Sequence, residues 1–390
     1  MDAQAMRDAT ALFDDLQDPR VVGRCKHRLT DIVMIALVAL IGPCQEWDDV
    51  EDFGKAYEDW FKRFLELPHG IPSHDTFGRV FGMLDPAQMN TCFEAWLTFL
   101  VNQLGEDAAP IKTIAIDGKT LAGSTKAKGV DDRHKPLHLV SAWAHESGLV
   151  LGQVKCDEKS NEITAIPDLL DMLDLEGKLV TIDAMGCQKT IAQKLHENKA
   201  DYALTLKDNH QTLCTQAALL MAEADGEDGP VKGKTHRTDD RGHGREEMRL
   251  YTVVELSKHT THRVGDDVRA EWPGLSAIGR VVRMRTEKGK TSVQTRYYLL
   301  SDPGVKRFAK AARGHWGIEN KLHWVLDVTM GEDANRTSKD HGPENLAILR
   351  RLALNLLRMA REHTKKTMTK MRKRIGYNVN YLEEVLNAVF

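Results

Sequence analysis

The order of predicted strands and helices between residues 111 and 206 constrains the fold of this chain more than any other feature. Some segments alternate apolar and polar residues or form short apolar runs, and others repeat apolar residues at helical spacing. In chain order they are a strand at 111–121, two strands around the turn HESG at 138–156, a helix at 162–173, a strand at 179–184, a helix at 188–199 and a strand at 201–206. A three-strand meander followed by two parallel strands with crossover helices is the ribonuclease H-like order, so we predict an α/β chain with a mixed-sheet core of that type.

The regions on either side of this segment have different residue patterns, which divide the chain into domains. Residues 1–105 carry apolar residues at helical spacing, which predicts an all-helical N-terminal domain. Gly-rich polar stretches and hairpin signals at 226–300 predict a β-rich insertion. Helical periodicity then returns. We therefore expect the core to comprise residues 106–225 and 301–362, followed by a basic C-terminal tail at 363–390.

Charge, cysteine spacing and the length of apolar runs limit the kinds of partner and compartment that we expect. The net charge is −3, yet residues 350–374 carry ten Lys and Arg residues against one acid. Such a stripe either binds phosphates or forms a solvated helix face. The six cysteines include no CxxC pair, which excludes zinc-knuckle spacing and is typical of a reducing cytosol. The longest apolar run, at 32–42, is too short to span a bilayer, so we expect a cytoplasmic protein without a membrane partner.

Two aspartates mark a candidate catalytic site. Asp117 is predicted to end the first strand and Asp183 the fourth, and these strands are expected to be adjacent and parallel. The carboxylates would then face each other about 5 Å apart at a topological switch point. Carboxylates that close repel, and two divalent ions about 3.5–4 Å apart would relieve the repulsion and support phosphoryl transfer. Oxygen ligands favour Mg²⁺ or Mn²⁺. Alone, an Asp before Gly is more often a turn residue.

The segment HWGIENKLHWVLD at 315–327 offers a third carboxylate. Glu319, His323 and Asp327 follow one another at intervals of four residues, as on one stripe of a helix. The alternative is a charged solvent face. We interpret Glu319 as the third carboxylate and expect the two tryptophans to pack the helix onto the sheet. The rival acids are Asp327, Glu332 and Asp333.

Several motifs carry a family resemblance. IAIDGKT, TIDAMGCQ and HWGIENKLHWVLDVTMGEDANR resemble the DDE transposases of bacterial insertion sequences, in the group that includes the H-repeat-associated proteins. HGIPSHDTFGRVF and PENLAILRRLALNLLR extend the resemblance over about residues 12–360. It implies a ribonuclease H-like core, divalent metal, and DNA cleavage and joining at transposon ends. By motif position it implies that Asp117, Asp183 and Glu319 are the catalytic and metal-binding residues.

The chain departs from the family pattern around the Glu. Related transposases often place a Tyr, an Arg and a Lys at set spacings there, and these positions hold Ala312, His315 and Leu326. The phosphate contacts would then fall to basic residues of the same segment, between which the sequence does not choose: Arg313, His315, Lys321 and His323.

Other candidates for DNA contact lie outside this segment. Lys119 is two residues past Asp117, and Lys207 ends the fifth strand. The insertion contains DDRGHGREEMR, with Arg241, His243 and Arg245 near a Gly-rich turn. Each of these has the alternative of being a solvated turn or hairpin residue.

The leading functional interpretation is a DNA transposase acting on transposon terminal repeats and target DNA. We expect a nucleoid-associated homodimer on DNA, with the helical N-terminal domain as a possible end-binding unit and two Mg²⁺ or Mn²⁺ ions as cofactors. One alternative is a metal-dependent nuclease that cuts without joining. The other is a domesticated, sequence-specific DNA-binding protein without activity.

Overall fold

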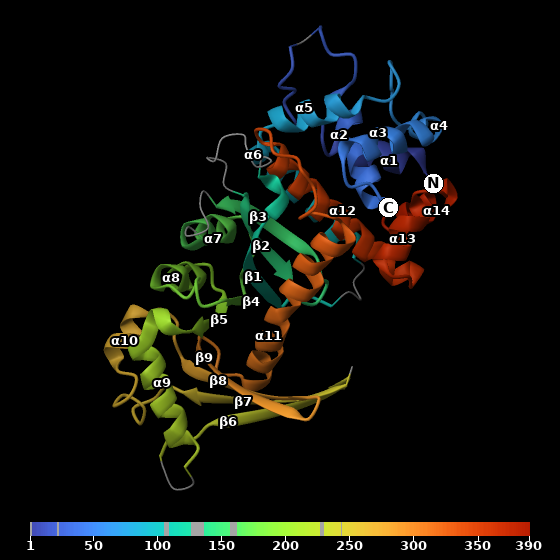
Figure 1. Ribbon diagram of the computed structural model, residues 1–390. Coiled ribbons are helices and arrows are strands. Elements are labelled where there is room, and N and C mark those ends of the chain that lie inside the picture. The colour runs from blue at the N-terminus through green and yellow to red at the C-terminus, as the bar shows by residue number, and fades with distance from the viewer. Residues whose placement is uncertain are drawn as a thin grey trace.

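A large mixed sheet lies at the centre of the computed structural model, with the N-terminal and C-terminal helices gathered at one end (Figure 1). The structure describes residues 2–21, 23–104, 109–125, 136–156, 162–226, 230–242 and 244–390. The predicted α/β class with N-terminal helices is confirmed.

The sheet has nine strands in the order β3-β2-β1-β4-β5-β9-β8-β7-β6. The first half contains the predicted meander and the two parallel strands. β1 pairs antiparallel with β2 and parallel with β4, and β5 continues the parallel part. The adjacency of the first and fourth strands is therefore as predicted. The bounds are β1 (Thr113–Thr120), β2 (His138–Ala144), β3 (Val150–Cys156), β4 (Leu179–Ile182) and β5 (Asp201–Leu206).

The strands of the predicted insertion extend the central sheet. The last residues of β9 pair antiparallel with β5, from Leu206↔Tyr297 to Ala203↔Leu300. β8, β7 and β6 then follow as antiparallel neighbours. The bounds are β6 (Lys234–Gly242), β7 (Arg245–Glu255), β8 (Ala277–Glu287) and β9 (Lys290–Leu300), and the short α10 (Asp266–Glu271) lies between β7 and β8. These long strands lie at the opposite end of the molecule from the N-terminal and C-terminal helices (Figure 1).

Helices cover both faces of the first half of the sheet. A Cβ at Gly152 of β3 would touch Leu169 of α7, whereas a Cβ at Gly317 would touch Trp143 of β2. The registers place Gly152 opposite Ala142, the neighbour of Trp143, so α7 and the end of α11 lie on opposite faces. The bounds are α7 (Glu162–Asp171), α8 (Lys189–Glu197), α9 (Gln211–Ala224) and α11 (Val305–Gly317), with short 3₁₀ turns at Ala122–Ser124 and Asp208–His210.

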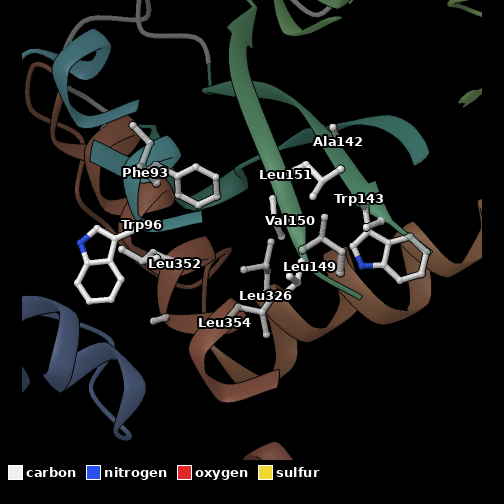
Figure 2. Close-up of a cluster of buried hydrophobic side chains, with 14 of the residues drawn as sticks. Phe93, Trp96, Ala142, Trp143, Leu149, Val150, Leu151, Leu326, Leu352 and Leu354 are labelled. Atoms are coloured by element: carbon white, nitrogen blue, oxygen red, sulfur yellow. The ribbon is translucent and has the colours of Figure 1, made fainter. Parts of the chain in front are cut away.

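The N-terminal helices pack onto the sheet through the long helix α12 (Gly342–Thr364). α2 (Leu29–Ile41) is apolar on nearly every side and is buried along its length. α6 (Pro86–Gln103) begins with the Asp85 side chain accepting from an amide and with a proline in the first turn. Figure 2 shows Phe93 and Trp96 of α6 near Leu352 of α12, beside strands of the sheet. The remaining N-terminal bounds are α1 (Ala3–Ala11), α3 (Trp47–Ala56), α4 (Glu58–Phe61) and α5 (His74–Met83).

The basic stripe at 350–374 is not one continuous surface. Arg350, Arg351, Arg358 and Arg372 are buried. Arg372 donates to backbone carbonyls of Gly42, Leu40 and Cys44, which ties the C-terminal region to the N-terminal helices. At these positions neither alternative, phosphate binding nor a solvated helix face, is correct. Composition counts charges but does not show which of them are buried.

The C-terminal residues form packed helices where a tail was expected. They are α13 (Met368–Ile375) and α14 (Val379–Asn387), with Met371, Ile375, Tyr381 and Leu382 buried. Among the described residues, no helix combines the length and apolarity that a membrane crossing needs.

Candidate active site

Asp117 and Asp183 lie side by side where β1 and β4 stop pairing. The parallel register ends at Ile116 and Ile182, and the aspartates are the next residues on the two strands. Side chains alternate across a strand, so both aspartates continue the same face of the sheet. Our prediction that Asp117 ends its strand is wrong, because β1 runs on to Thr120, paired with β2. At Asp117 the strand β1 is therefore paired with β2 on one side and unpaired on the side of β4.

The two carboxyl groups lie in an environment that disfavours their charge. Burial, and then the negative charge of Asp183, raise the pKa of Asp117 to about 7. Burial also raises the pKa of Asp183, although the amides of Met185 and Gly186 donate to its Oδ1 at 3.0 and 3.3 Å. The positive charge of Lys207 lowers the pKa of Asp183 by a smaller amount. A cation between the two carboxyl groups would therefore stabilise their ionised forms.

Glu319 approaches the same pair from the helix after the insertion. Its carboxylate is exposed, and its negative charge is one of the smaller contributions that raise the pKa of Asp117, after burial and Asp183. The segment is not the α-helix that we expected. Ile318–His323 and Val325–Thr329 are π-helical, directly after α11. π-helical turns are rare and are frequent at functional sites.

The tryptophans of this segment do not pack it onto the sheet, contrary to our prediction. Trp316 is 42% exposed and Trp324 is 56% exposed. The buried apolar residues of the segment are Ile318, Leu322 and Leu326, which lie in the main hydrophobic core. These aliphatic residues fix the segment and leave the indoles at the surface.

The rival acids are paired with internal cations. Lys119 Nζ lies 2.7 Å from Asp327 Oδ1, 2.8 Å from Asp333 Oδ1 and 3.6 Å from Glu332 Oε2. Glu332 also accepts from Arg351 at 2.8 Å, and neither of these two side chains is exposed. Lys119, which we expected at a phosphate, is itself buried in this network. Each of the three acids therefore has a cationic partner within the protein, whereas Glu319 forms no ion pair in the described part of the chain.

His323, which we expected to contact DNA, is buried next to Asp117. Its Nδ1 is 3.6 Å from Asp117 Oδ2, and the residue is buried. Burial, followed by the positive charges of Arg351 and Lys119, lowers the pKa of His323 to about 3, so the imidazole is neutral. A neutral ring so placed can steady the Asp117 carboxyl.

The other basic candidates near Glu319 differ in their access to solvent. His315 Nδ1 is 3.0 Å from Thr181 Oγ1 of β4, and burial lowers the pKa of His315 to about 4. His315 thus fixes α11 to the sheet as a neutral group. Lys321 is exposed, with Nζ 5.9 Å from the ring centroid of Trp143.

An arginine-rich pocket lies between α11 and strands β7–β9. Arg245 and Arg313 line it, and Arg313 pairs with Asp240. The guanidinium groups of Arg283 and Arg296 lie 5.8 and 5.0 Å from the ring centroid of Trp316. These last two arginines were not predicted from the sequence, although Arg283 alternates with Arg285 on β8. The other lining residues include Arg249, Glu247, Tyr298 and Asn320, the neighbour of Glu319.

The remaining candidates are placed as follows. Lys207 is exposed after β5, close enough to Asp183 to influence its charge. Arg241 is exposed near the end of β6, with Nε 3.4 Å from Glu246 Oε1. His243 lies outside the described residues.

The donor set at the aspartate pair suits a hard divalent ion. Its side chains are carboxylates, which are the ligands that Mg²⁺ and Mn²⁺ prefer. The half-buried, mutually repelling pair is the feature that such an ion would stabilise. Within the described ranges, no three His, Cys, Asp or Glu side chains are gathered closely enough to form a complete metal-binding group.

Comparisons with family models match two consecutive parts of the chain. Residues 10–97 match the model described as "DDE_Tnp_1-associated", and residues 108–356 match the one described as "Transposase DDE domain".

Similar proteins of known sequence come from Escherichia coli. "Putative transposase YncI" of strain O157:H7 is 39% identical over 397 residues, covering 99% of this chain and 95% of the relative. "H repeat-associated putative transposase YhhI" of strain K12 is 37% identical, covering 95% of each chain. Among solved structures, a piggyBac transposase synaptic complex with hairpin DNA matches with a TM-score of 0.43 and 10% identity, covering 98% of this chain and 81% of that one.

Proposed function

The chain belongs to the family of transposases with a DDE domain, and from that premise we propose that it cleaves DNA at transposon ends and joins the ends to target DNA. The observation that carries the proposal is the convergence of Asp117 and Asp183 just beyond the last register pair of two adjacent parallel strands. Glu319 adds a third, uncompensated carboxylate. We assign this site to a ribonuclease H-like core of residues 106–225 and 301–362.

Asp117, Asp183 and Glu319 would hold two Mg²⁺ or Mn²⁺ ions. When bound, such ions activate an attacking oxygen and stabilise the leaving oxygen of a phosphodiester. The chain's own contribution is positioning. The amides of Met185 and Gly186 fix the Asp183 carboxylate, and neutral His323 abuts that of Asp117. Glu319 approaches the pair from a π-helical segment that aliphatic residues anchor in the core.

DNA contacts are assigned to the basic residues that remain accessible. Lys207 lies near Asp183, Lys321 is exposed two residues after Glu319, and Asn320, beside Glu319, lines the arginine-rich pocket. Arginine forks suit phosphate oxygens. Arg245 and Arg241 extend this basic surface along β6 and β7. The partners are the terminal repeats and a target duplex, bound by a homodimer whose N-terminal helices contact the ends.

A strand-transfer assay tests the proposal. Labelled end DNA and a target plasmid are incubated with the full chain and Mg²⁺, and cleaved and joined products are resolved on a gel. Asp183→Asn should abolish both products and leave DNA binding intact. Asp266→Asn, at an exposed aspartate of α10, serves as the matched control with unchanged products.

The same assay separates the alternatives. Cleaved ends that never join the target would overturn the transposase assignment in favour of a nuclease. Specific binding without any cleavage would favour a DNA-binding protein, and cleavage by Asp183→Asn would refute the assignment of the site.

A further inference from the structure

A fourth acid, Glu162, reaches the site from the opposite face of the sheet. It is the first residue of α7 and is buried. Its Oε1 lies 2.7 Å from His138 Nε2, and His138 Nδ1 lies 2.8 Å from Thr120 Oγ1. Thr120 and His138 are register partners on β1 and β2. Side chains on two strands thus hold the carboxylate in a fixed place.

Gly118 makes room for this carboxylate next to Asp117. A Cβ on Gly118 would lie 2.4 Å from Glu162 Oε1 and 2.8 Å from His138 Nε2. Gly118 is in the interior of β1, so the Asp-Gly pair here is no turn. Its missing side chain lets an acid on the α7 face come up against the backbone of the strand that carries Asp117.

Glu162 lies close to the first aspartate of the site. Its carboxylate is packed against Gly118, the residue that follows Asp117 on β1. A hydrogen bond to His138 alone would not require Glu162 to lie against the strand that carries Asp117. Burying a third acid beside two others is unfavourable unless a cation offsets it.

An unsatisfied polar atom beside Asp117 points independently to a missing polar ligand. Ser141 is the register partner of Asp117 and is fully buried, and its Oγ has no hydrogen-bond partner in the described part of the chain. A buried polar atom of this kind usually marks an ion or an ordered water.

We propose that Glu162 is a fourth carboxylate of the divalent-metal site, positioned by His138 and admitted by the absence of a side chain at Gly118. The inference rests on the proposed transposase function, because it assumes ions at Asp117 and Asp183. Glu162 supplies an oxygen ligand from the α7 face, opposite to Glu319. His138 is a positioning residue that acts through Glu162.

The test measures metal binding directly by titrating Mn²⁺ into the full-length protein in a calorimeter. Glu162→Gln should weaken Mn²⁺ binding by about 10- to 100-fold, the range seen when residues supporting a metal site are removed. His138→Phe should weaken it less. Gly118→Ala should also weaken it, because the new methyl group displaces the carboxylate without removing its charge. Glu344→Gln, at a part-buried acid beside Lys155, is the matched control with unchanged affinity.

Thermal unfolding without metal separates a metal-site role from a structural role. If Glu162 is a ligand, Glu162→Gln removes a repelling charge and leaves the melting temperature unchanged or higher. A lower melting temperature with wild-type Mn²⁺ affinity would overturn the inference and make Glu162 a structural partner of His138.

Asp183→Asn distinguishes this inference from the proposed function. Loss of Mn²⁺ binding in Asp183→Asn together with wild-type affinity in Glu162→Gln would overturn the fourth ligand alone. Wild-type affinity in both variants would overturn the metal site of the proposed function as well.

Discussion

The ionised Asp117 side chain should destabilise the metal-free protein at neutral and alkaline pH. Its pKa is raised to about 7 from an ordinary value of 3.8, by burial and then by Asp183. A raised carboxyl pKa means that the folded state binds the proton more tightly than the unfolded state. The resulting stability is fully present below pH 3.8 and is lost progressively as pH rises to about 7. About three pH units at roughly 1.4 kcal/mol each give about 4 kcal/mol.

Asp117→Asn should therefore stabilise the protein while abolishing catalysis. With a chelator present, urea unfolding at about pH 8 should show a free energy of unfolding higher than wild type by up to about 4 kcal/mol, and by much less at about pH 4. The side chain is 27% exposed, so solvent screening makes this an upper limit. Adding Mg²⁺ should raise the stability of wild type and not that of the variant.

The control for this experiment is Asp59→Asn, which changes an exposed aspartate and should leave unfolding unchanged at both pH values. If Asp117→Asn is no more stable than wild type under the alkaline, metal-free condition, then the carboxylates are not in electrostatic conflict. That result would remove the physical reason for a metal at this site.

Two further perturbations test the surroundings of the site. Glu332→Gln should lower the free energy of unfolding by about 3–5 kcal/mol, because it leaves the fully buried Arg351 without its charged partner; an unchanged urea midpoint would contradict this. Arg296→Ala should reduce the slope of log affinity for DNA against log salt by about one, measured by fluorescence anisotropy. An unchanged slope would mean that the pocket at Trp316 does not contact phosphates.

The part of the site that depends on strand order could be predicted from the sequence. Strand signals are local, and a general handedness rule makes the first and fourth strands neighbours. Asp117 and Asp183 could therefore be paired from strand order alone, and the register places them one residue beyond Ile116 and Ile182. The error over the end of β1 was small. It arose because the pair Asp117-Gly118 predicts a turn, whereas in the structure the glycine makes room for the Glu162 side chain.

What could not be predicted depends on contacts between distant segments. β9 joins the central sheet at β5, although almost a hundred residues separate Tyr297 from Leu206. Burial of Arg350 and Arg372 depends on backbone carbonyls at the end of α2 and just beyond it. Helical periodicity could not reveal the π-helical turns after α11, because their extra residue per turn changes which side chains face the sheet. Trp316, near the end of α11, lies among arginines that come from distant strands, β8 and β9.

The choice of the third carboxylate shows how the structure divides one acidic segment into two roles. Between residues 319 and 333 the chain carries Glu319, Asp327, Glu332 and Asp333, and spacing alone does not rank them. Lys119 and Arg351 lie against the last three and offset part of their charge within the fold. Lys119 is on the same strand as Asp117, so the strand that carries the first aspartate also positions a cation for these acids. The remaining acids are Asp117, Asp183 and Glu319, with Glu162 on the opposite face of the sheet. Lys207 offsets part of the charge at Asp183, and a bound divalent cation would offset the rest.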